Sequence, residues 1–437
     1  MSVLPVDRLM EAIQQVDIAP VVGRVTGAQG LIIESAGPKA KLNELCALRG
    51  DGMEIPAEVV GFRDDKVLLM PLAEVNGLRT GWTVHGSGGP LKAPTGEGLL
   101  GRVIDGLGQP LDGGPVPDGC PMRPVTGLPP APLLRQRISQ PLTLGVRAMD
   151  AMLTIGQGQR IGIFAGSGVG KSTLLGMIAR STTADCSVIA LVGERGREVR
   201  EFIERDLGEE GLQRSVVVVA TSEQPALVRI RAALAATTIA ESFRDRGLNV
   251  VLMMDSVTRL AQAQREVGLS IGEPPATRGY TPSVFTMLPR VLERSGTAQT
   301  GSVTGIYTVL VDGDDMNEPV ADAVRGILDG HVVLSRKLAH AGYFPAIDVL
   351  ASVSRVMPEV TSREHQMLAR KFRSLMSAYR ETEDLINIGA YQHGTNPLVD
   401  EAIRKMPAMR QFLAQNIDEP TDFAMAMDGL RSLCRED

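Results

Sequence analysis

Between about Arg160 and Arg355, short runs of apolar residues alternate with longer stretches whose apolar residues recur at helical spacing. The predicted strands are Ile161–Ala165, Val188–Val192, Val216–Ala220, Val250–Asp255, Ser302–Val311 and His331–Leu334. Their side chains are apolar at consecutive positions, which is typical of parallel strands buried on both faces. The pattern therefore predicts a largely parallel sheet covered by helices such as Lys171–Arg180 and Ala226–Arg246.

The chain follows different patterns on either side of this region. From about Val21 to Lys92, short β-like runs separated by Gly and Asp or Asn predict a small closed β-barrel. A passage rich in Gly and Pro follows, and its composition indicates a boundary or a long surface connection. Beyond Met357 the sequence is helical and charged. The expected organisation is a barrel at 19–92, an α/β domain at 93–357 and a C-terminal helical domain at 358–437.

Residues 1–18 predict a separate short helix. Leu9, Ile13 and Val16 recur at helical spacing, and Asp7 is suited to cap the helix N-terminus. Such an amphipathic helix either docks on a partner or covers its own domain, and the sequence leaves both interpretations open.

Composition narrows the class of protein. The 437 residues are 43% hydrophobic and 22% charged, as in globular proteins, and the net charge is −6. This acidic balance argues against a protein whose main task is to neutralise nucleic-acid phosphates. The four cysteines are far apart and form no pair with metal-ligand spacing, so we interpret them as reduced thiols. No apolar run approaches the ~18 residues of a membrane span, so a cytoplasmic location is expected.

The strongest chemical signal follows the first predicted strand of the sheet. It consists of Ala165, Gly166, Ser167, Gly168, Val169, Gly170, Lys171 and Ser172, with Thr173 next to them. Glycines between a strand and a helix let successive backbone N–H groups surround phosphate oxygens, and the helix N-terminus adds its positive dipole end. Lys171 would reach the β- and γ-phosphates, and the Ser172 hydroxyl would bind Mg²⁺. Ala165 stands where the first glycine is usual, so the loop departs from the strict phosphate-binding pattern at one position.

Two carboxylates follow the ends of other predicted strands. Asp255 ends an apolar strand, where it would support Mg²⁺ or its waters. Glu194 follows Val188–Val192 and would polarise a water molecule in line with the γ-phosphate. Glu198 and Glu201 are rivals for this role, and a solvated run of charged residues is the alternative interpretation of the whole segment.

Several motifs together resemble the rotary ATP synthase α/β-subunit superfamily, and most of all its flagellar protein-export ATPases and their injectisome relatives. The resemblance covers about Val21 to the C-terminus, and its motifs are 193–198, Gly272–Tyr280, Val311–Pro319, Leu328–His331 and Pro345–Ser354. It implies a central RecA-like ATPase domain between the barrel and the C-terminal helices. It also implies a homo-oligomer, in the form of a hexameric ring, that hydrolyses ATP with Mg²⁺.

The resemblance also assigns residue roles that the pattern alone does not give. Glu194 corresponds to the catalytic carboxylate, and Arg195 corresponds to a supporting arginine. Arg355 corresponds to the arginine finger that a neighbouring subunit inserts into the site. Phe344 stands where relatives often place a tyrosine against the adenine, so it keeps the stacking face without the hydroxyl. Because one chain carries both Glu194 and Arg355, every interface of a homo-oligomer would be catalytic.

The implied function is ATP hydrolysis that energises protein export by a flagellar type III secretion apparatus. The implied partners are a stator-like regulator at residues 1–18, a central stalk protein gripped by Gly272–Phe285 in the ring pore, the export gate, export substrates and their chaperones. No direct nucleic-acid binding is expected, and contact with the membrane would run through partners. Three alternatives remain: an injectisome secretion ATPase, a catalytic subunit of a proton-translocating ATP synthase, and a RecA-like RNA translocase.

Overall fold

The computed structural model describes residues 22–115, 119–311, 313 and 315–435. The described chain divides into two compact units, one ending at Leu91 and including Ser270–Gly272, the other formed by Lys92–Leu269 and the chain from Glu273 onward. The helix expected at residues 1–18 lies outside the described residues. The expected domain boundaries at residues 92 and 357 stay predictions.

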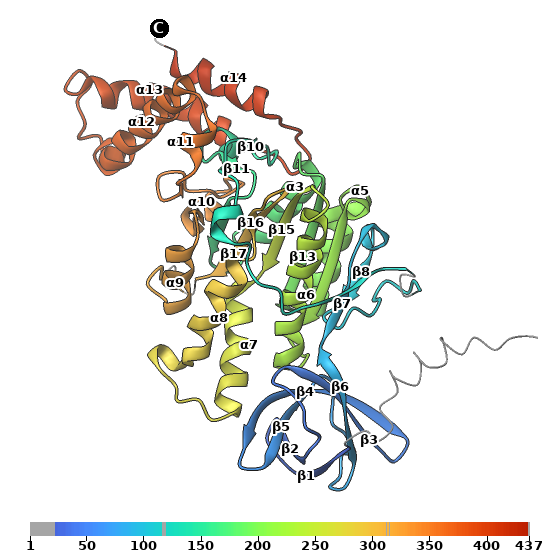
Figure 1. Cartoon of the computed structure of the whole chain (residues 1–437). Coiled ribbons are helices and arrows are strands. Elements are labelled where there is room, and N and C mark those ends of the chain that lie inside the picture. The colour runs from blue at the N-terminus through green and yellow to red at the C-terminus, as the bar shows by residue number, and fades with distance from the viewer. Residues whose placement is uncertain (1–21, 116–118, 312, 314, 436–437) are drawn as a thin grey trace, which may run out of the picture. The chain divides into compact units, whose positions relative to one another are not determined.

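The first unit contains the expected barrel (Figure 1). Its strands, in the described part of the chain, are β1 (Gly23–Gln29), β2 (Ile32–Ala36), β3 (Glu44–Gly50), β4 (Met53–Arg63), β5 (Lys66–Pro71) and β6 (Thr83–Pro90). They close in the order β1-β2-β5-β4-β3-β6, and every neighbouring pair is antiparallel. Alternate residues such as Cys46, Leu48, Ala57 and Val59 point inward and are fully buried, which gives the barrel its own core.

The second unit is built on one large sheet whose central strands are parallel, as the apolar runs predict. Its strand order among the described residues is β19 (Val353–Ser354), β18 (Gly330–Leu334), β12 (Arg160–Ala165), β17 (Ser302–Leu310), β15 (Asn249–Asp255), β13 (Cys186–Glu194), β14 (Ser215–Thr221) and β8 (Val103–Asp105), with β16 (Gly296–Thr297) paired to β17. The short strand β19 at one end is antiparallel to β18. Because the other strands in this order are parallel, their carboxyl ends meet at one edge of the sheet.

The passage rich in Gly and Pro is more regular than its composition predicts. It contributes the end of β6, the last residue of the edge strand β8, and a small sheet of β7 (Lys92–Pro94) and β9 (Met122–Pro124). The strand β8 pairs in parallel with β14, where Val103 lies beside Val217. These segments form regular strands because pairing with distant strands compensates for poor local propensity. The boundary between the two units falls in the same passage, at Leu91 and Lys92.

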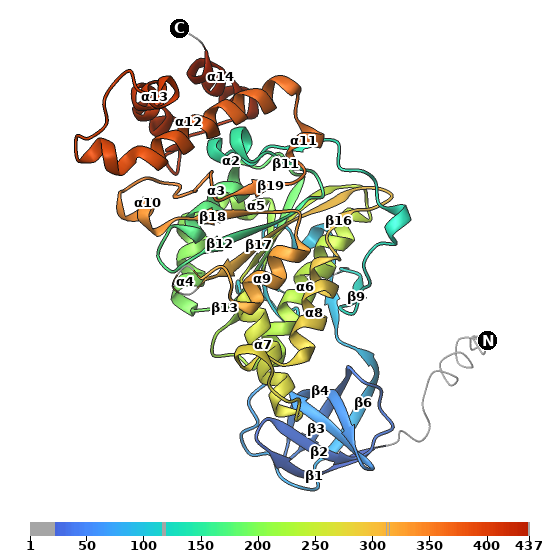
Figure 2. The same ribbon diagram turned by 90° about the vertical axis from the view of Figure 1, so that its left-hand side faces the viewer.

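Helices cover the sheet and continue into the C-terminal part (Figures 1 and 2). Their bounds are α2 (Arg147–Met152), α3 (Lys171–Ser181), α4 (Gly196–Glu201), the π-helical turn Phe202–Leu207, α5 (Gly208–Gln213), α6 (Ala226–Arg244), α7 (Val257–Ser270), α8 (Pro282–Leu292), α9 (Pro319–Ile327), α10 (Arg336–His340), α11 (Met357–Val360), α12 (Arg363–Asn387), α13 (Pro397–Leu413) and α14 (Phe423–Cys434). A further small pair of strands, β10 (Pro141–Leu142) and β11 (Ile155–Gly156), lies beside α2 and α11.

One continuous apolar core joins the sheet to the C-terminal helices. It combines every second residue of the central strands, such as Ile163 and Leu191, with Leu175 of α3, Phe372 of α12 and Leu430 of α14. The helices α12, α13 and α14 all contact α2, which links them to the sheet. Displacement of the C-terminal helices would therefore disturb the packing of β12 and α3, which flank the glycine-rich loop. No helix in the described part of the chain is long and apolar enough to cross a bilayer.

Candidate active site

The glycine-rich loop joins the carboxyl end of β12 to the first turn of α3. Gly168 and Gly170 have φ values of 75° and 89°, in the left-handed region that favours glycine. Ala165 is the last residue of β12, is fully buried, and is not among the described residues with positive φ. The position therefore requires a small side chain rather than glycine, which explains why the departure from the strict pattern is tolerated.

Three charged side chains converge behind this loop from three different elements. The Nζ atom of Lys171, at the start of α3, lies 2.5 Å from Oδ1 of Asp255 and 3.5 Å from Oε1 of Glu194. Asp255 ends β15 and Glu194 ends β13, so both carboxylates come from carboxyl ends of neighbouring strands. The side chains of Lys171, Glu194 and Asp255 are only 12%, 14% and 3% exposed. The sequence motifs thus meet in one compact, largely buried cluster.

Burial and neighbouring charge shift the pKa values of this cluster. Burial raises the pKa of Glu194 to about 7; Lys171 opposes this shift, whereas the nearby carboxylates of Asp255 and Glu198 add to it. Burial alone would lower the pKa of Lys171, but the carboxylates of Asp255 and Glu194 outweigh it and hold the pKa above its usual value. Glu194 is therefore poised to gain or lose a proton near neutral pH, while Lys171 stays a cation.

The residues expected to hold Mg²⁺ are Ser172, which follows Lys171 in α3, and Asp255, which belongs to the buried cluster. Ser172 and Thr173 occupy the first turn of α3 and are partly exposed, whereas Asp255 is buried. A hydroxyl and a carboxylate suit Mg²⁺, which is usually bound through one or two protein oxygens together with water and phosphate oxygens. The described residues contain no group of three or more His, Cys, Asp or Glu side chains able to hold a metal ion by themselves. The donor set thus fits an ion that arrives with a nucleotide.

Phe344 lies at the mouth of the loop. Its side chain is 46% exposed, and its ring carbon Cδ1 lies 3.4 Å from the point where a Cβ atom on Gly170 would stand. Its backbone carbonyl accepts a hydrogen bond from the backbone N–H of Gln415 at 2.9 Å. An exposed aromatic face thus stands beside the loop, although the two segments are far apart in sequence.

Arg195 and the rival carboxylates sit further from Lys171. Arg195 is 75% exposed on its side chain, and its Nη1 atom lies 3.4 Å from Oε1 of Glu198. Glu198 also neighbours the Glu194 carboxyl group, whereas Glu201 is partly exposed and pairs with Arg197 at 3.7 Å. Among these carboxylates, Glu194 is the one that contacts the buried lysine.

Arg355 lies at the opposite edge of the sheet from the loop of its own chain. It follows β19, where Ser354 pairs with Gly330 at the amino end of β18, and its backbone N–H donates to the Asp329 carbonyl. Asp329 in turn lies beside Arg160, the first residue of β12, whereas the loop follows the last residue of that strand. The side chain of Arg355 is exposed. The structure therefore does not bring Arg355 together with Lys171 and Glu194 of the same chain.

Two residues near the cluster were missed by the sequence interpretation. The hydroxyl of Thr308 donates to Oδ1 of Asp255 at 2.7 Å and is fully buried. Arg259 packs under Gly193, where an added Cβ would lie 2.9 Å from the arginine Cβ, and its buried Nε atom has no partner among the described residues. The position of Thr308 near the end of a buried strand was the available signal for this residue. Arg259 had no local signal.

The parallel sheet, the glycine-rich loop and the strand-end carboxylates define a P-loop nucleotide-binding protein. Residues 145–354 match the nucleotide-binding domain of the ATP synthase alpha/beta family, and residues 25–88 match the beta-barrel domain of that family. Residues 361–432 match the T3SS EscN ATPase C-terminal domain. Together with the identities below, these matches show that the chain belongs to the ATP synthase alpha/beta family, in its flagellar and type III secretion ATPase branch.

The similarity to individual relatives extends over nearly the whole chain. The sequence is 55% identical to the flagellum-specific ATP synthase of Bacillus subtilis, over 97% of this chain and 98% of that protein. It is 50% identical to the type 3 secretion system ATPase of Xanthomonas euvesicatoria, over 94% and 93%. The assembled ATPase EscN of enteropathogenic E. coli superposes with a TM-score of 0.90 at 47% identity, over 94% of this chain and all of that one. EscN in complex with its central stalk EscO gives a TM-score of 0.88 at 46% identity, with the same coverage.

Proposed function

We propose that this protein hydrolyses ATP in the cytoplasm to energise protein export by a flagellar type III secretion apparatus. The observation that carries the proposal is the buried cluster of Lys171, Glu194 and Asp255 behind the glycine-rich loop. This arrangement combines a cation for phosphate, a carboxylate for water and a carboxylate for Mg²⁺ in one place. Family membership and relatives named flagellum-specific ATP synthase supply the export context.

Each side chain at the loop has a separate task in this mechanism. The backbone from Ala165 to Thr173 surrounds the phosphates, and Lys171 moves from its carboxylate partners to the β- and γ-phosphates. Ser172 and Asp255 would hold Mg²⁺ or its waters, and a bound ion would supply positive charge beside the phosphates. Glu194 orients a water molecule, whose oxygen bonds to the γ-phosphorus while the bond to the β–γ bridging oxygen breaks. The water proton passes to the Glu194 carboxylate or to a phosphate oxygen.

The adenine side of the site is formed by Phe344. Its exposed ring beside Gly170 offers a stacking face to the base, and it lacks the hydroxyl of a tyrosine. Arg195 is exposed beside Glu198 and supports the catalytic carboxylate electrostatically. These roles complete the nucleotide site within one chain, except for a cation on the leaving side of the γ-phosphate.

A neighbouring copy of the chain supplies that missing cation through Arg355. The residue is exposed and lies at the far edge of the sheet from its own loop, so it reaches a loop only in another subunit. Each chain carries both halves of a site, so identical chains pair head to tail, with Arg355 of one subunit at the loop of the next. Repetition of such a heterologous contact around an axis closes a ring. We assign a homohexamer, in line with the assembled state of the related EscN.

The export partners follow from the same branch of the family. The Gly272–Phe285 segment faces the ring pore, where a central stalk protein binds, as EscN binds its stalk EscO. Tyr280 of this segment is buried and packs against Phe285, so it would support the segment rather than contact the stalk. Arg278 in this segment pairs with Asp315 at 3.0 Å. A stator-like regulator binds residues 1–18, and the export gate, export substrates and chaperones are further partners. Through them the protein attaches peripherally to the inner face of the plasma membrane.

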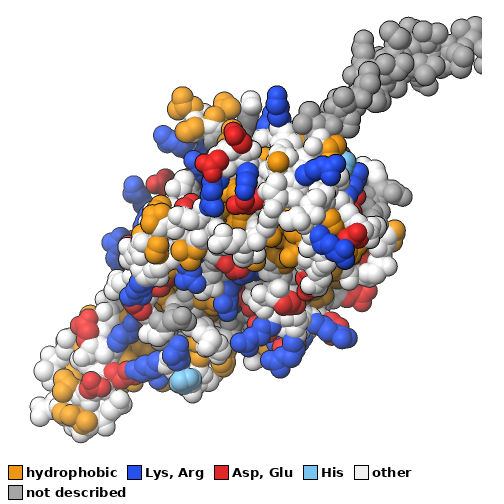
Figure 3. Space-filling view, turned by 90° about the horizontal axis from the view of Figure 1, so that it is seen from below, with side chains coloured by type: hydrophobic (Ala, Val, Ile, Leu, Met, Phe, Trp, Pro, Cys, Tyr) orange, Lys and Arg blue, Asp and Glu red, His pale blue; other side chains and the backbone are white. Residues whose placement is uncertain are grey.

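The injectisome ATPase is the second candidate, because the Xanthomonas relative is nearly as similar and carries that name. The other two alternatives are weaker. One chain carries both the catalytic carboxylate, Glu194, and Arg355. This disfavours the ATP synthase subunit, which needs a dissimilar partner subunit to complete its site. The face in Figure 3 interleaves basic and acidic side chains, and the net charge is −6, which disfavours an RNA translocase.

Complementation separates the flagellar from the injectisome function. We expect this chain to restore swimming to Bacillus subtilis that lacks its own flagellum-specific ATP synthase, and the Lys171→Ala variant to fail. Restoration of secretion in Xanthomonas euvesicatoria without restoration of swimming would favour the injectisome function. Purified protein with Mg²⁺ should release phosphate from ATP, and no release in the assembled state would overturn the proposal altogether.

A further inference from the structure

Arg355 is held by a corner of the chain formed by Leu328 and Asp329. The Arg355 backbone N–H donates to the Asp329 carbonyl at 3.0 Å, and its Nη1 atom donates to the Leu328 carbonyl at 3.2 Å. Both the backbone and the side chain of the exposed arginine are therefore fixed to the same two residues. The direction of Arg355 depends on how rigidly this corner is held.

Arg160 holds the corner through a two-pronged contact with the Asp329 carboxylate. Its Nε and Nη2 atoms donate to the two carboxylate oxygens of Asp329 at 3.1 and 3.2 Å, and its backbone N–H donates to Oδ2 at 3.0 Å. The Asp329 backbone N–H returns a hydrogen bond to the Arg160 carbonyl at 2.8 Å. Such a planar bidentate pair fixes orientation as well as distance.

Gln159 ties the same corner to Ser354, the last residue of β19, which directly precedes Arg355. Its Nε2 atom donates to the Asp329 carbonyl at 3.3 Å and to the Ser354 hydroxyl at 3.0 Å. The Ser354 hydroxyl in turn donates to the buried Thr154 carbonyl at 2.9 Å. Gln159 is fully buried, so its amide has little freedom to find other partners.

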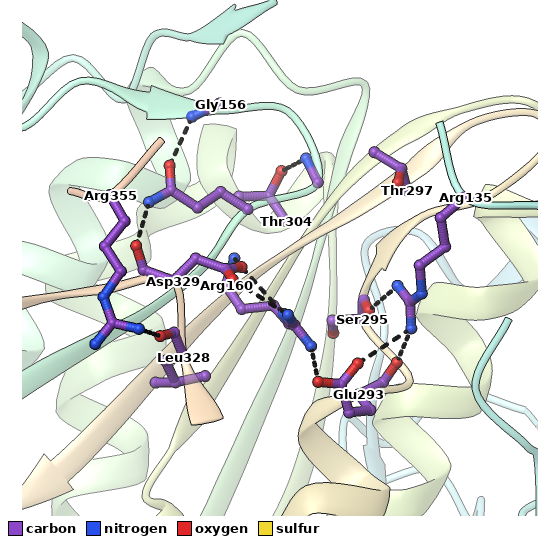
Figure 4. A network of polar contacts seen from close by, with 12 residues as sticks. Arg135, Gly156, Arg160, Glu293, Ser295, Thr297, Thr304, Leu328, Asp329 and Arg355 are labelled. Carbon is purple, nitrogen blue, oxygen red and sulfur yellow. Dashed lines mark hydrogen bonds and ion pairs between the residues drawn. The ribbon is translucent and has the colours of Figure 1, made fainter. Parts of the chain in front are cut away.

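The network reaches further, to the end of α8 (Figure 4). The Arg160 guanidinium also forms an ion pair with Glu293, which Arg135 approaches from the other side at 3.4 Å. Arg135 additionally donates to the Ser295 carbonyl at 2.9 Å. Arg160 is thus neutralised by two carboxylates, whereas no carboxylate of the described residues forms an ion pair with Arg355. The network therefore leaves the Arg355 guanidinium available to an anion outside the chain.

We propose that Asp329 and Arg160 are positioning residues for Arg355, so that they act on the ATP site of the neighbouring subunit rather than on their own. This inference rests on the proposed role of Arg355 in the partner's site. The network fixes where the guanidinium points, and displacement of a catalytic group by about 1 Å can cost on the order of 10²-fold in rate. Asp329 touches no nucleotide and acts only through Arg355.

The test compares Asp329→Asn in two backgrounds of the full-length assembled protein. In the wild-type background we expect kcat to fall about 10²-fold, with KM for ATP little changed, because the loop of each chain is intact. In the Arg355→Ala background the same substitution should change kcat by less than about twofold, since no arginine remains to be positioned. The matched control is Asp322→Asn, which removes another aspartate that pairs with an arginine, Arg325, at 2.7 Å; it should leave kcat unchanged.

The outcomes separate this inference from the proposed function. An Arg355→Ala variant with normal turnover would overturn the trans role itself. A slow Arg355→Ala variant combined with an equal loss for Asp329→Asn in both backgrounds would overturn the positioning role alone. Binding of a fluorescent ATP analogue to each variant verifies folding, because the loop lies at the other edge of the sheet. If Asp329→Asn fails this check, Arg160→Lys replaces it, with the same pair of expectations and a smaller fall in kcat.

Discussion

The two edges of the central sheet carry opposite arrangements of charge. At the carboxyl edge, Lys171 is buried between Asp255 and Glu194, so the cation and both carboxylates are shielded from water. At the amino edge, Arg160 is neutralised by Asp329 and Glu293, and Arg355 remains exposed without a carboxylate partner among the described residues. One edge is built to receive a charged ligand, and the other is built to present a charge.

The difference explains why a single chain does not complete its own site. The carboxyl and amino edges are separated by the length of the parallel strands, so Arg355 and the loop of one chain do not meet. A closed ring brings the amino edge of one subunit to the carboxyl edge of the next. Catalysis thus depends on assembly. Substitutions at the carboxyl edge and at the amino edge should therefore differ in their effects on ATP binding and on turnover.

Removal of Lys171 should have the largest effect. The Lys171→Ala variant loses the cation that binds phosphate and leaves Asp255 and Glu194 facing each other without compensation. We expect no detectable phosphate release and strongly weakened binding of a fluorescent ATP analogue. Lys337→Ala, which removes a lysine side chain that is 83% exposed, is the control and should behave like wild type. Normal turnover by Lys171→Ala would remove the loop from the mechanism.

Removal of the exposed cation, Arg355, should have the second-largest effect. Arg355→Ala should lower kcat by about 10³-fold or more, because an arginine that stabilises the transferring phosphoryl group is worth that much in related reactions. Binding of ATP to each chain should persist, since the loop is untouched. Parallel measurements of phosphate release and ATP binding test this. A simultaneous loss of binding would indicate that Arg355 supports the fold instead.

At the carboxyl edge, loss of the Glu194 carboxylate should differ from loss of Lys171, because it should affect turnover and not ATP binding. Glu194→Gln should retain ATP binding and lose about 10²- to 10⁴-fold in turnover, because the amide cannot accept the water proton. Glu201→Gln is the matched control, at a partly exposed carboxylate that pairs with Arg197. A greater loss for Glu201→Gln than for Glu194→Gln would reassign the catalytic carboxylate.

The rate should also depend on pH through Glu194. Burial raises the pKa of this group to about 7, so it is mostly protonated at pH 6 and mostly ionised at pH 8. Because only the carboxylate polarises water, kcat/KM should rise about tenfold between these pH values. The residual activity of Glu194→Gln should lack this rise. A wild-type profile that falls across the same range would contradict the assignment.

Among the substitutions, Phe344→Ala should give the smallest effect. Phe344→Ala removes a stacking face beside Gly170 and should raise KM for ATP by about tenfold, the equivalent of one aromatic stacking contact. Phe344→Tyr retains the ring and should leave KM almost unchanged. Steady-state kinetics of both variants provide the test, and an equal KM for Phe344→Ala and wild type would place adenine elsewhere.

The local sequence predicts much of the fold because strong apolar patterns mark the central strands. The strands β12, β13, β14 and β15 and the helix α6 occur where their patterns indicate them. The strand β8 was missed because it is only three residues long, lies between two segments rich in Gly and Pro, and gains its partner far along the chain. Short segments of this kind are set by non-local pairing rather than by their own propensity.

The candidate site was predictable to a similar degree and for a similar reason. Glu194 and Asp255 each end an apolar strand, and Lys171 begins the helix that follows the loop after a third strand, so topology brings them together. Phe344 and Arg355 carry no such local signal and came from resemblance to a family. Thr308 and the clamp of Arg160 on Asp329 depend on contacts between segments distant in sequence, which only the folded chain reveals.

A mixture of two inactive variants tests the composite site most directly. Arg355→Ala chains keep a complete loop, and Glu194→Gln chains keep the arginine that the loop requires. In rings assembled from equal amounts of both, random placement makes about one quarter of the interfaces complete, and phosphate release should recover accordingly. Absence of any recovery at every mixing ratio, in rings shown to contain both chains, would contradict a site shared between subunits.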